Sequence, residues 1–298
     1  MIVPPPNGPG LAILPPVTTG LRSRVDAALA AFLDARRDQV ERLDPSALPL
    51  VNEVRRLVDA GGKRIRPAFC YWGFRAAGGK DGEAIVRAAA ALELLHTMAL
   101  VHDDLIDGAK ERRGVPSTAV WFSERASELG APGDPMDFGS SMAVLVGDVS
   151  AVWADGLLLA SGFSPEVLVP ALSVYHDMRE QMAVGQYLDV GGAECDPQVA
   201  RRAAALKGGS YTVEGPLLIG AALAGGSEGM KEGLSRFGRP LGEAFQLRDD
   251  LEDGEALAGV TRETVNGLVA EAKASLDPDL LTAESIRALA DLTDMVAM

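Results

Sequence analysis

Helical periodicity runs through almost the whole chain and limits its fold more than any other feature. From Leu21 onward, apolar residues recur at spacings of three and four, and glycine or proline separates one such segment from the next. Patterns typical of β-strands are nearly missing. The predicted helices cover residues 21–42, 46–60, 64–77, 82–107, 117–129, 140–162, 165–190, 197–224, 229–253 and 261–297, the last with a break near Pro278. The sequence therefore predicts an all-α fold.

Several segments are apolar on more than one face, as in the alanine-rich run 88–92, which is typical of helices in the middle of a large bundle. Hydrophobic residues make up 47% of the 298 residues, enough for the core of one large domain. No linker or repeat divides the chain, and the segment 130–139 is expected to be a surface loop. We expect a proline-rich arm over residues 1–20 and one helical domain over residues 21–298.

Charge and cysteine content exclude other classes of protein. Acidic residues outnumber basic residues by 42 to 28, and the net charge of -14 argues against nucleic acid as a partner. The two cysteines, Cys70 and Cys195, lack motif spacing and are expected to be buried thiols, which leaves zinc without a ligand set. So few cysteines indicate a reducing compartment, and we expect a cytoplasmic location.

The sequence predicts no transmembrane segment. The most apolar stretches, 142–159 and 216–224, are either short or interrupted by Asp148 and Asp155. The first sixteen residues contain six prolines and no positive charge, so they match neither a signal peptide nor a helix.

A strongly apolar segment, residues 92–102, ends in a cluster of three carboxylates. Asp103 and Asp107 lie one helical turn apart, so their side chains emerge on the same face and can share a divalent cation, with Asp104 between them. Ligation by a few oxygens suits Mg²⁺, which keeps waters and recruits substrate phosphates. A solvated helix end is the alternative. Acidic residues at a helix C-terminus oppose the helix dipole, which favours the metal site.

A second apolar helix leads into another acidic pair, Asp249 and Asp250. Two such helices facing one another would surround metal ions with carboxylates, and the metal ions would then bind a diphosphate. A chain with a net charge of -14 can hold such a polyanion because bound Mg²⁺ inverts the local charge.

Basic residues occur where such a site needs them. The Gly-Gly-Lys-Arg-Ile-Arg-Pro run that contains Lys63, Arg64 and Arg66 predicts a loop that enters a helix, with cations placed to bind phosphate. A solvated turn is the alternative. Arg112 and Arg113 follow the first aspartate cluster closely enough to reach the same ligand.

Together these segments resemble the trans-isoprenyl diphosphate synthases, the family that makes farnesyl, geranylgeranyl and longer diphosphates. The resemblance covers residues 22–251 in order. It is carried by residues 61–67, Asp103-Asp104-x-x-Asp107, Arg112-Arg113-Gly114, Gly147-Asp148, Gly185-Gln186 with Asp189, and Phe245-Gln246 before Asp249-Asp250. It implies the isoprenoid synthase fold, a large helical bundle around a central apolar cavity, assembled as a homodimer.

The resemblance also implies which residues contact the two diphosphates. The implied ligands of isopentenyl diphosphate are Lys63, Arg66, His96 and Arg113. The implied contact of the allylic diphosphate is Arg112.

A metal set and an allylic set complete the implied site. The implied metal ligands, around three Mg²⁺ ions with bound diphosphate, are Asp103, Asp107, Asp249 and Asp250. Lys207 and Gln246 belong to the allylic site and join Asp103 and Asp107 as the implied catalytic residues. The family normally has threonine where this chain has Gly208, which removes one hydroxyl contact.

The implied reaction begins with metal-assisted ionisation of the allylic diphosphate. The isopentenyl double bond then attacks the carbocation in a water-poor cavity, and a proton is lost to the released diphosphate. Ala99 and Leu95, one and two turns before Asp103, are expected to line the path of the growing chain. Met98 and Ala99 obstruct this path less than the bulky aromatics of farnesyl synthases, so we predict a geranylgeranyl (C20) or similar product.

Other functions are also compatible with parts of the pattern. A class I terpene cyclase would share the bundle and the first aspartate cluster, but it would lack the 61–67 run and carry an Asn/Ser/Glu metal motif in place of the second acidic pair. Glu93-x-x-His96 is half of a di-iron site, although such sites need two of these motifs, and His96 is otherwise a satisfied core histidine.

After about residue 251 the resemblance fails. The family normally continues with a loop that contains Gly-Lys and a further pair of helices, and the sequence lacks this segment. A non-catalytic subunit of a heteromeric prenyl synthase is therefore a further alternative.

Overall fold

Helices form nearly all regular structure in the computed structural model, which describes residues 16–112, 114–191, 197–254 and 260–297. The helices are α1 (Pro16–Leu43), α2 (Leu48–Asp59), α3 (Ile65–Ala76), α4 (Glu83–Ile106), α5 (Thr118–Glu124), α6 (Pro135–Leu159), α7 (Pro165–Val190), α8 (Pro197–Ala204), α9 (Gly215–Leu223), α10 (Glu228–Asp253), α11 (Arg262–Ala274) and α12 (Ala283–Ala297). A 3₁₀ turn (Pro45–Ala47), a π-helical segment (Ala205–Glu214) and a hairpin of strands β1 (Glu111–Arg112) and β2 (Val115–Pro116) complete the described structure. The predicted all-α fold is confirmed.

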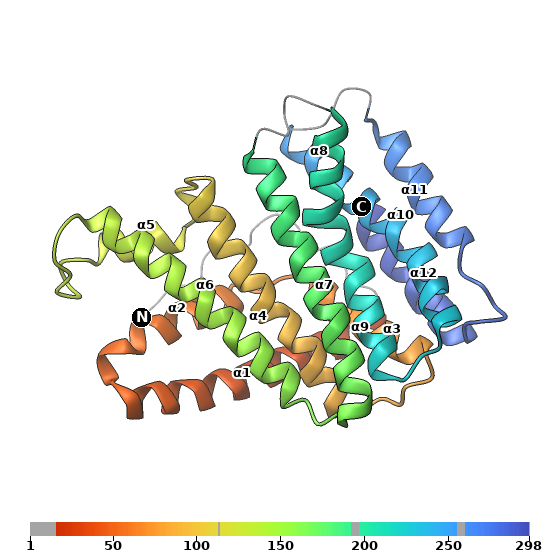
Figure 1. Cartoon of the computed structure of the whole chain (residues 1–298), viewed down its shortest axis with the longest axis horizontal. Coiled ribbons are helices and arrows are strands. Elements are labelled where there is room, and N and C mark those ends of the chain that lie inside the picture. Colours follow the sequence, from red (N-terminus) through yellow and green to blue (C-terminus); the bar gives the residue numbers. More distant parts are fainter. Residues whose placement is uncertain (1–15, 113, 192–196, 255–259, 298) are drawn as a thin grey trace.

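The alanine-rich helix α4 is a central element of the core. Residues 88–92 have at most 1% of their surface exposed, and the helix packs against α1, α3 and α6. In Figure 1, α4 and α6 run side by side. Small side chains allow neighbours to approach α4 closely on several sides, so the run that predicted an interior helix does lie in the interior.

A second group of helices contains the other acidic pair. α10, α11 and α12 pack on one another at the right-hand side of Figure 1. The π-helical segment Ala205–Glu214 contacts both α7 and α10, so it connects this group to the rest of the bundle.

Three predicted boundaries are wrong. α1 begins at Pro16 rather than at residue 21, which shortens the predicted arm to residues 1–15, outside the described residues. α6 begins at Pro135, because Asp134 caps it by accepting hydrogen bonds from the backbone N–H groups of Met136 and Asp137. The surface loop predicted over 130–139 therefore ends at the cap.

The single helix predicted over 197–224 is also wrong in detail. It consists of α8, the π-helical segment and α9 in succession. Gly208 and Gly209 lie in the π-helical segment and Pro216 lies in the first turn of α9, so the backbone departs from α-helical geometry where its sequence is least helical.

Two helices, α4 and α6, are long and apolar enough to resemble membrane-spanning helices. By length and composition alone, α4 and α6 could each cross a membrane. The apolar window of α4 is 72% buried inside the protein, which makes it a core helix, whereas that of α6 is only 44% buried. Asp148 and Asp155 interrupt the stretch 142–159 in the sequence, but these two charges do not prevent α6 from being long and apolar enough to cross a membrane. Its outer face carries exposed apolar side chains such as Val144, Leu145 and Val152.

Candidate active site

The first aspartate cluster lies at the C-terminal end of α4, where Asp103, Asp104 and Asp107 form what we call the first aspartate face. α4 ends at Ile106, and Asp107 follows as its cap residue. Partial desolvation of its carboxyl group, together with the neighbouring Asp103 carboxylate, raises the pKa of Asp107. A cation between these carboxyl groups would relieve both effects, so the donor set fits a hard divalent ion.

Lys207 is the principal cation at this face. Its Nζ lies 2.9 Å from Asp103 Oδ1 and donates a 2.8 Å hydrogen bond to Asp189 Oδ2 of α7. Burial alone would lower the pKa of Lys207, but the hydrogen bonds and charges of the two aspartates outweigh burial and raise the pKa. The predicted allylic-site residue therefore stays charged next to the predicted metal ligands.

Arg112 reaches the same face from the hairpin. Its Nε donates to Asp104 Oδ1 at 2.7 Å, and one of its terminal nitrogens donates to Asp103 Oδ2 at 3.3 Å. Because Asp104 is engaged by Arg112 in this way, it differs from Asp107, whose carboxyl is exposed. Arg113 lies outside the described residues.

Buried contacts hold the hairpin in place. Glu53 of α2 has no exposed surface, pairs with Arg56 at 2.6 Å and accepts a 2.8 Å hydrogen bond from Thr118 of α5. Arg56 also donates to the carbonyl of Pro116 in β2. α2 and α5 thus fix the strand pair that presents Arg112.

The second acidic pair lies in the last turns of α10 and forms what we call the second aspartate face, Asp249 and Asp250. Asp250 Oδ1 accepts a 2.7 Å hydrogen bond from Gln246 Nε2, one turn earlier on the same helix. Asp249 pairs with its neighbour Arg248 at 2.6 Å. Arg248 also donates to the carbonyls of Met295 and Val296, which fixes it to the end of α12.

Glycines in the π-helical segment let it pack closely on α10, the helix that carries the second aspartate face. The backbones of Gly209 and Gly242 are in direct contact, and a Cβ on Gly209 would lie 3.1 Å from the carbonyl carbon of Gly242. A Cβ on Gly208 would overlap the Oε1 atom of Gln246. Lys207, which pairs with Asp103 of the first face, is therefore followed at once by a residue that touches Gln246, which is hydrogen-bonded to Asp250 of the second face. At position 208, where the family normally has threonine, the Gln246 amide occupies the space that a side chain would need.

The predicted isopentenyl diphosphate ligands lie where α3, α4 and the π-helical segment meet. Arg66 donates a 2.9 Å hydrogen bond to Thr212, and its guanidinium lies 4.4 Å from the ring centre of Tyr211. The His96 ring lies 6.2 Å from the same tyrosine. Lys63 is exposed just before α3. The structure thus places Arg66 and His96 beside the same aromatic ring.

Tyr211 is the residue that sequence reasoning missed. It is buried, and burial raises the pKa of its hydroxyl. Spacing along the sequence gave no signal for it, because the residues it contacts, Arg66 and His96, lie more than 100 positions earlier in the chain.

Arg64 corrects the prediction that all three cations of the 61–67 run face a phosphate. It is only 8% exposed and ion-paired at 2.7 Å with Glu93, which is 6% exposed. The same ion pair argues against a di-iron site at Glu93 and His96, because Glu93 already binds the Arg64 guanidinium. Leu95 is also corrected: it has no exposed surface and packs in the core, whereas Ala99 is half-buried.

Among the described residues, no three histidine, cysteine or carboxylate side chains converge closely enough to hold a metal ion by themselves. Mg²⁺ commonly binds to one or two carboxylates, and substrate oxygens and water then complete its ligand shell. The carboxylates of the two faces are the groups that the sequence predicts for the ion.

An all-helical bundle with an acidic pair at the ends of two helices defines the isoprenoid synthase class. The family model of polyprenyl synthetases matches residues 49–276, and the chain belongs to that family. A short chain isoprenyl diphosphate synthase of Methanothermobacter thermautotrophicus is 32% identical over 248 residues, which cover 80% of this chain and 68% of the relative. A geranylgeranyl diphosphate synthase of Methanosarcina mazei is 30% identical over 239 residues, covering 78% and 64%.

A solved structure is similar to this chain over a larger share of its own length than these two relatives are. The geranylgeranyl pyrophosphate synthase of Corynebacterium glutamicum, complexed with isoprenyl diphosphate and magnesium, superposes with a TM-score of 0.84 at 28% identity, covering 93% of this chain and 98% of that chain. Against several curated relatives, by contrast, the chain spans less than two thirds of their length, between 57% and 64%.

Proposed function

We propose that the chain is a trans-prenyltransferase that condenses isopentenyl diphosphate with an allylic diphosphate to give an all-trans polyprenyl diphosphate. The observation that carries the proposal is the gathering of Lys207 and Arg112 on Asp103, at the end of an apolar helix. Carboxylates that bind a cation and cations that bind a diphosphate are the two partners this chemistry requires, and here they neutralise each other.

The residues of the chain have separable tasks in this reaction. Asp103 and Asp107, with Asp249 and Asp250 across the site, would hold Mg²⁺, three ions by the family resemblance, and the bound ions supply the electrophilic pull on the leaving diphosphate. When the substrate diphosphate arrives, Lys207 and Arg112 exchange their aspartate partners for its oxygens. Gln246 is held beside this site by Gly208 and Asp250.

The second substrate binds on the Tyr211 side. Lys63, Arg66 and His96 are the proposed ligands of isopentenyl diphosphate, together with Arg113. The mainly apolar wall of α4 excludes water from the carbocation, and the departing proton goes to the released diphosphate. The protein positions and desolvates both substrates, so no covalent nucleophile is required.

We propose a geranylgeranyl product because Ala99 leaves space one turn before Asp103. Curated relatives carry names that include geranylgeranyl, geranylfarnesyl, nonaprenyl and farnesyl diphosphate synthase, so family membership alone does not fix the length. Ala99 is half-buried whereas Leu95 is fully buried, so Ala99 is the residue we propose to line the path of the growing chain.

We also propose a cytoplasmic homodimer that uses the apolar outer faces of α6 and α7. Large side chains on these faces are exposed, including Val152 at 64% and Leu159 at 55% on α6, and Val169 at 63% and Tyr187 at 77% on α7. A second copy covering this surface would remove it from water, which is the usual reason for such a patch.

The short connection after Asp253 bears on the alternative of a non-catalytic subunit. α10 ends at Asp253 and α11 begins at Arg262, so eight residues of sequence, 254–261, connect them, fewer than a further pair of helices would need. If the second aspartate face were open to solvent, water would react with the carbocation and metal binding would be weaker. The match over 98% of a chain that binds isoprenyl diphosphate and magnesium supports the synthase instead.

A product assay tests the proposal. The purified chain is incubated with isopentenyl diphosphate and, in turn, dimethylallyl, geranyl or farnesyl diphosphate, with Mg²⁺ or with a chelator. We expect a C20 diphosphate with Mg²⁺ and no condensation with the chelator. A cyclic hydrocarbon formed from an allylic diphosphate alone would identify a cyclase, and failure with every starter would reject catalysis by the isolated chain.

A further inference from the structure

Arg64 has an unusual backbone conformation. Its φ of 53° and ψ of 43° are left-handed, and it is the only residue other than glycine with a positive φ among the described residues. A side chain with a Cβ adopts this conformation only where surrounding contacts enforce it. The strain lies in the loop that leads into α3, directly beside the proposed isopentenyl diphosphate site.

Three contacts hold the Arg64 side chain, and each comes from a different helix. Nη1 donates to Glu93 Oε2 of α4 at 2.7 Å, Nε donates to Asp26 Oδ1 of α1 at 2.8 Å, and Nη2 donates to the carbonyl of Val58 at the end of α2 at 2.9 Å. Two carboxylates therefore neutralise the guanidinium, and these three hydrogen bonds join it to α1, α2 and α4 of the protein.

The Arg64–Glu93 pair connects residues that are proposed to share one substrate. Lys63 immediately precedes Arg64, and Arg66 lies two residues later in the first turn of α3. Glu93 lies three residues before His96 on α4, hence almost one helical turn away. The ion pair consequently fixes the loop that presents the two cations relative to the helix that presents the histidine.

We propose that Arg64 and Glu93 are positioning residues for isopentenyl diphosphate, an inference that rests on the proposed function. A buried ion pair contributes little to net stability, because desolvation offsets most of the attraction. Its effect here is to hold the strained loop in the one conformation in which Lys63, Arg66 and His96 bind the same diphosphate. The allylic site, which is built from the hairpin, the π-helical segment and α10, does not depend on it.

Glu93→Gln keeps the shape of the side chain and removes its charge. We expect the KM for isopentenyl diphosphate to rise on the order of tenfold, because small displacements of binding groups are costly. The KM for the allylic diphosphate and kcat should stay within about twofold in the same enzyme. A role limited to stability would lower the active fraction, and hence apparent kcat, with both KM values unchanged.

Arg64→Gly provides a second variant because glycine accepts a φ of 53° without strain, so the backbone can fold as before while the side-chain contacts are lost. It should reproduce the Glu93→Gln defect, and the double variant should be no worse than either single one, since both remove the same interaction. Arg64→Lys, which keeps a charge for Glu93, should recover part of the affinity.

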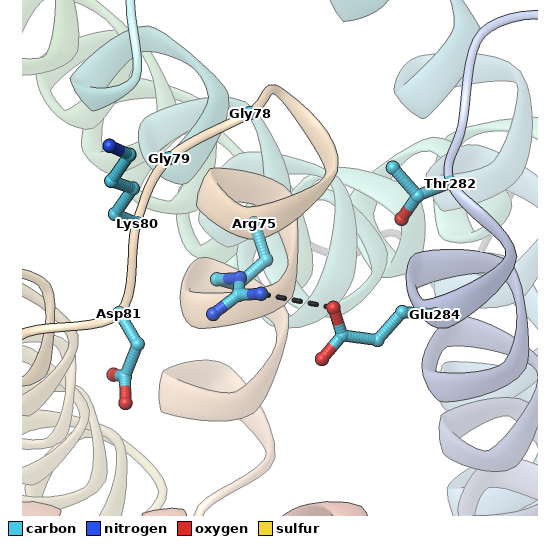
Figure 2. Close-up of a pocket in the computed structure, with 7 residues that line it drawn as sticks. All are labelled: Arg75, Gly78, Gly79, Lys80, Asp81, Thr282 and Glu284. Carbon is cyan, nitrogen blue, oxygen red and sulfur yellow. Dashed lines mark hydrogen bonds and ion pairs between the residues drawn. The ribbon is translucent and has the colours of Figure 1, made fainter.

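The other end of α3 supplies a matched control. Arg75 donates a 3.0 Å hydrogen bond to Glu284 of α12, beside a surface pocket lined by Gly78, Lys80 and Thr282 (Figure 2). Glu284→Gln makes the same chemical change to an ion pair of the same helix, and both KM values should remain those of the unmodified enzyme.

Equal changes in the two KM values, or additive defects in the double variant, would overturn the proposal. Hydrogen exchange tests the positioning role of Arg64 and Glu93 independently of the proposed function. If the unmodified chain shows no synthase activity, the proposed function fails, but Glu93→Gln must still accelerate amide exchange over residues 61–66 while Glu284→Gln does not. Unchanged exchange in that loop would reject the positioning role.

Discussion

The two aspartate faces are similar in sequence but differ in the residues that pair with their carboxylates. At the first face, the cations come from elsewhere in the chain: Lys207 from the π-helical segment and Arg112 from the hairpin. At the second face, the partners Gln246 and Arg248 belong to α10 itself. Cations on separate elements can move to an arriving diphosphate, whereas Arg248 is tied to the end of α12. The first face is therefore better prepared for exchange of partners.

The largest expected difference between the faces is in catalysis. Asp103→Ala should lower turnover on the order of 10²–10³-fold, because the leaving group loses its main electrostatic stabilisation. Asp249→Ala should lower it by less, roughly tenfold, about 1.4 kcal/mol of transition-state stabilisation. Steady-state kinetics at saturating Mg²⁺ measures both.

Asp34→Asn, which removes the surface partner of Arg55, is the control and should leave turnover unchanged. Near-normal turnover in Asp103→Ala would remove the metal assignment. Equal losses at the two positions would show that the second face is as complete as the first.

An intermediate effect is expected at the contact that joins the faces. A Cβ on Gly242 would overlap the carbonyl oxygen of Gly209, so Gly242→Ala must push α10 away from the π-helical segment. We expect a loss of about 1–3 kcal/mol in the free energy of unfolding, as for other overpacked sites, measured by urea denaturation. Turnover should fall as well, because the displacement also moves Gln246 relative to Lys207.

Gly267→Ala in α11 is the matched control for Gly242→Ala. A Cβ at Gly267 meets nothing within 4 Å, so alanine should stabilise the exposed helix by ~0.5–1 kcal/mol. If Gly242→Ala were as stable as Gly267→Ala, close backbone contact would not be what holds the faces together.

Much of the fold could be predicted because its signal is local. The spacing of apolar residues identifies most of the helices, and the alanine run at 88–92 identifies α4 as an interior helix. The boundaries that were wrong depend on single residues. Asp134 caps α6, which therefore begins at Pro135, five residues before the predicted start, and Gly208 and Gly209 lie in the segment where α-helix gives way to π-helix.

Site residues could be predicted only where they lie close together in the sequence and form a recognisable motif. The paired aspartates do so, because two carboxylates one turn apart are visible in the sequence. The inward orientation of Arg64 does not, since it depends on Glu93, which is 29 residues away. The contact between Arg66 and Thr212 spans 146 residues, so Tyr211 beside it could be placed only by tertiary packing.

The smallest expected effect on rate concerns the residue one turn before each acidic pair. α10 has Phe245 at this position, half-buried beneath the Arg248 guanidinium at 5.0 Å, whereas α4 has Ala99. Ala99→Phe gives the first face the aromatic that the second already has. The ring would fill space along the path of the growing chain, so the main product should shorten from C20 to C15, with little change in the consumption of isopentenyl diphosphate.

A graded series makes the test quantitative. Ala99→Val, Ala99→Leu and Ala99→Phe should shift the product distribution, measured by chromatography of the dephosphorylated alcohols, progressively toward shorter chains. Leu95→Val is the control: Leu95 is fully buried in the core, so this change should cost about 1 kcal/mol of stability and leave the product length as it was. A distribution that stays constant across the Ala99 series would show that this side of α4 does not limit the chain, and that the geranylgeranyl assignment needs another wall.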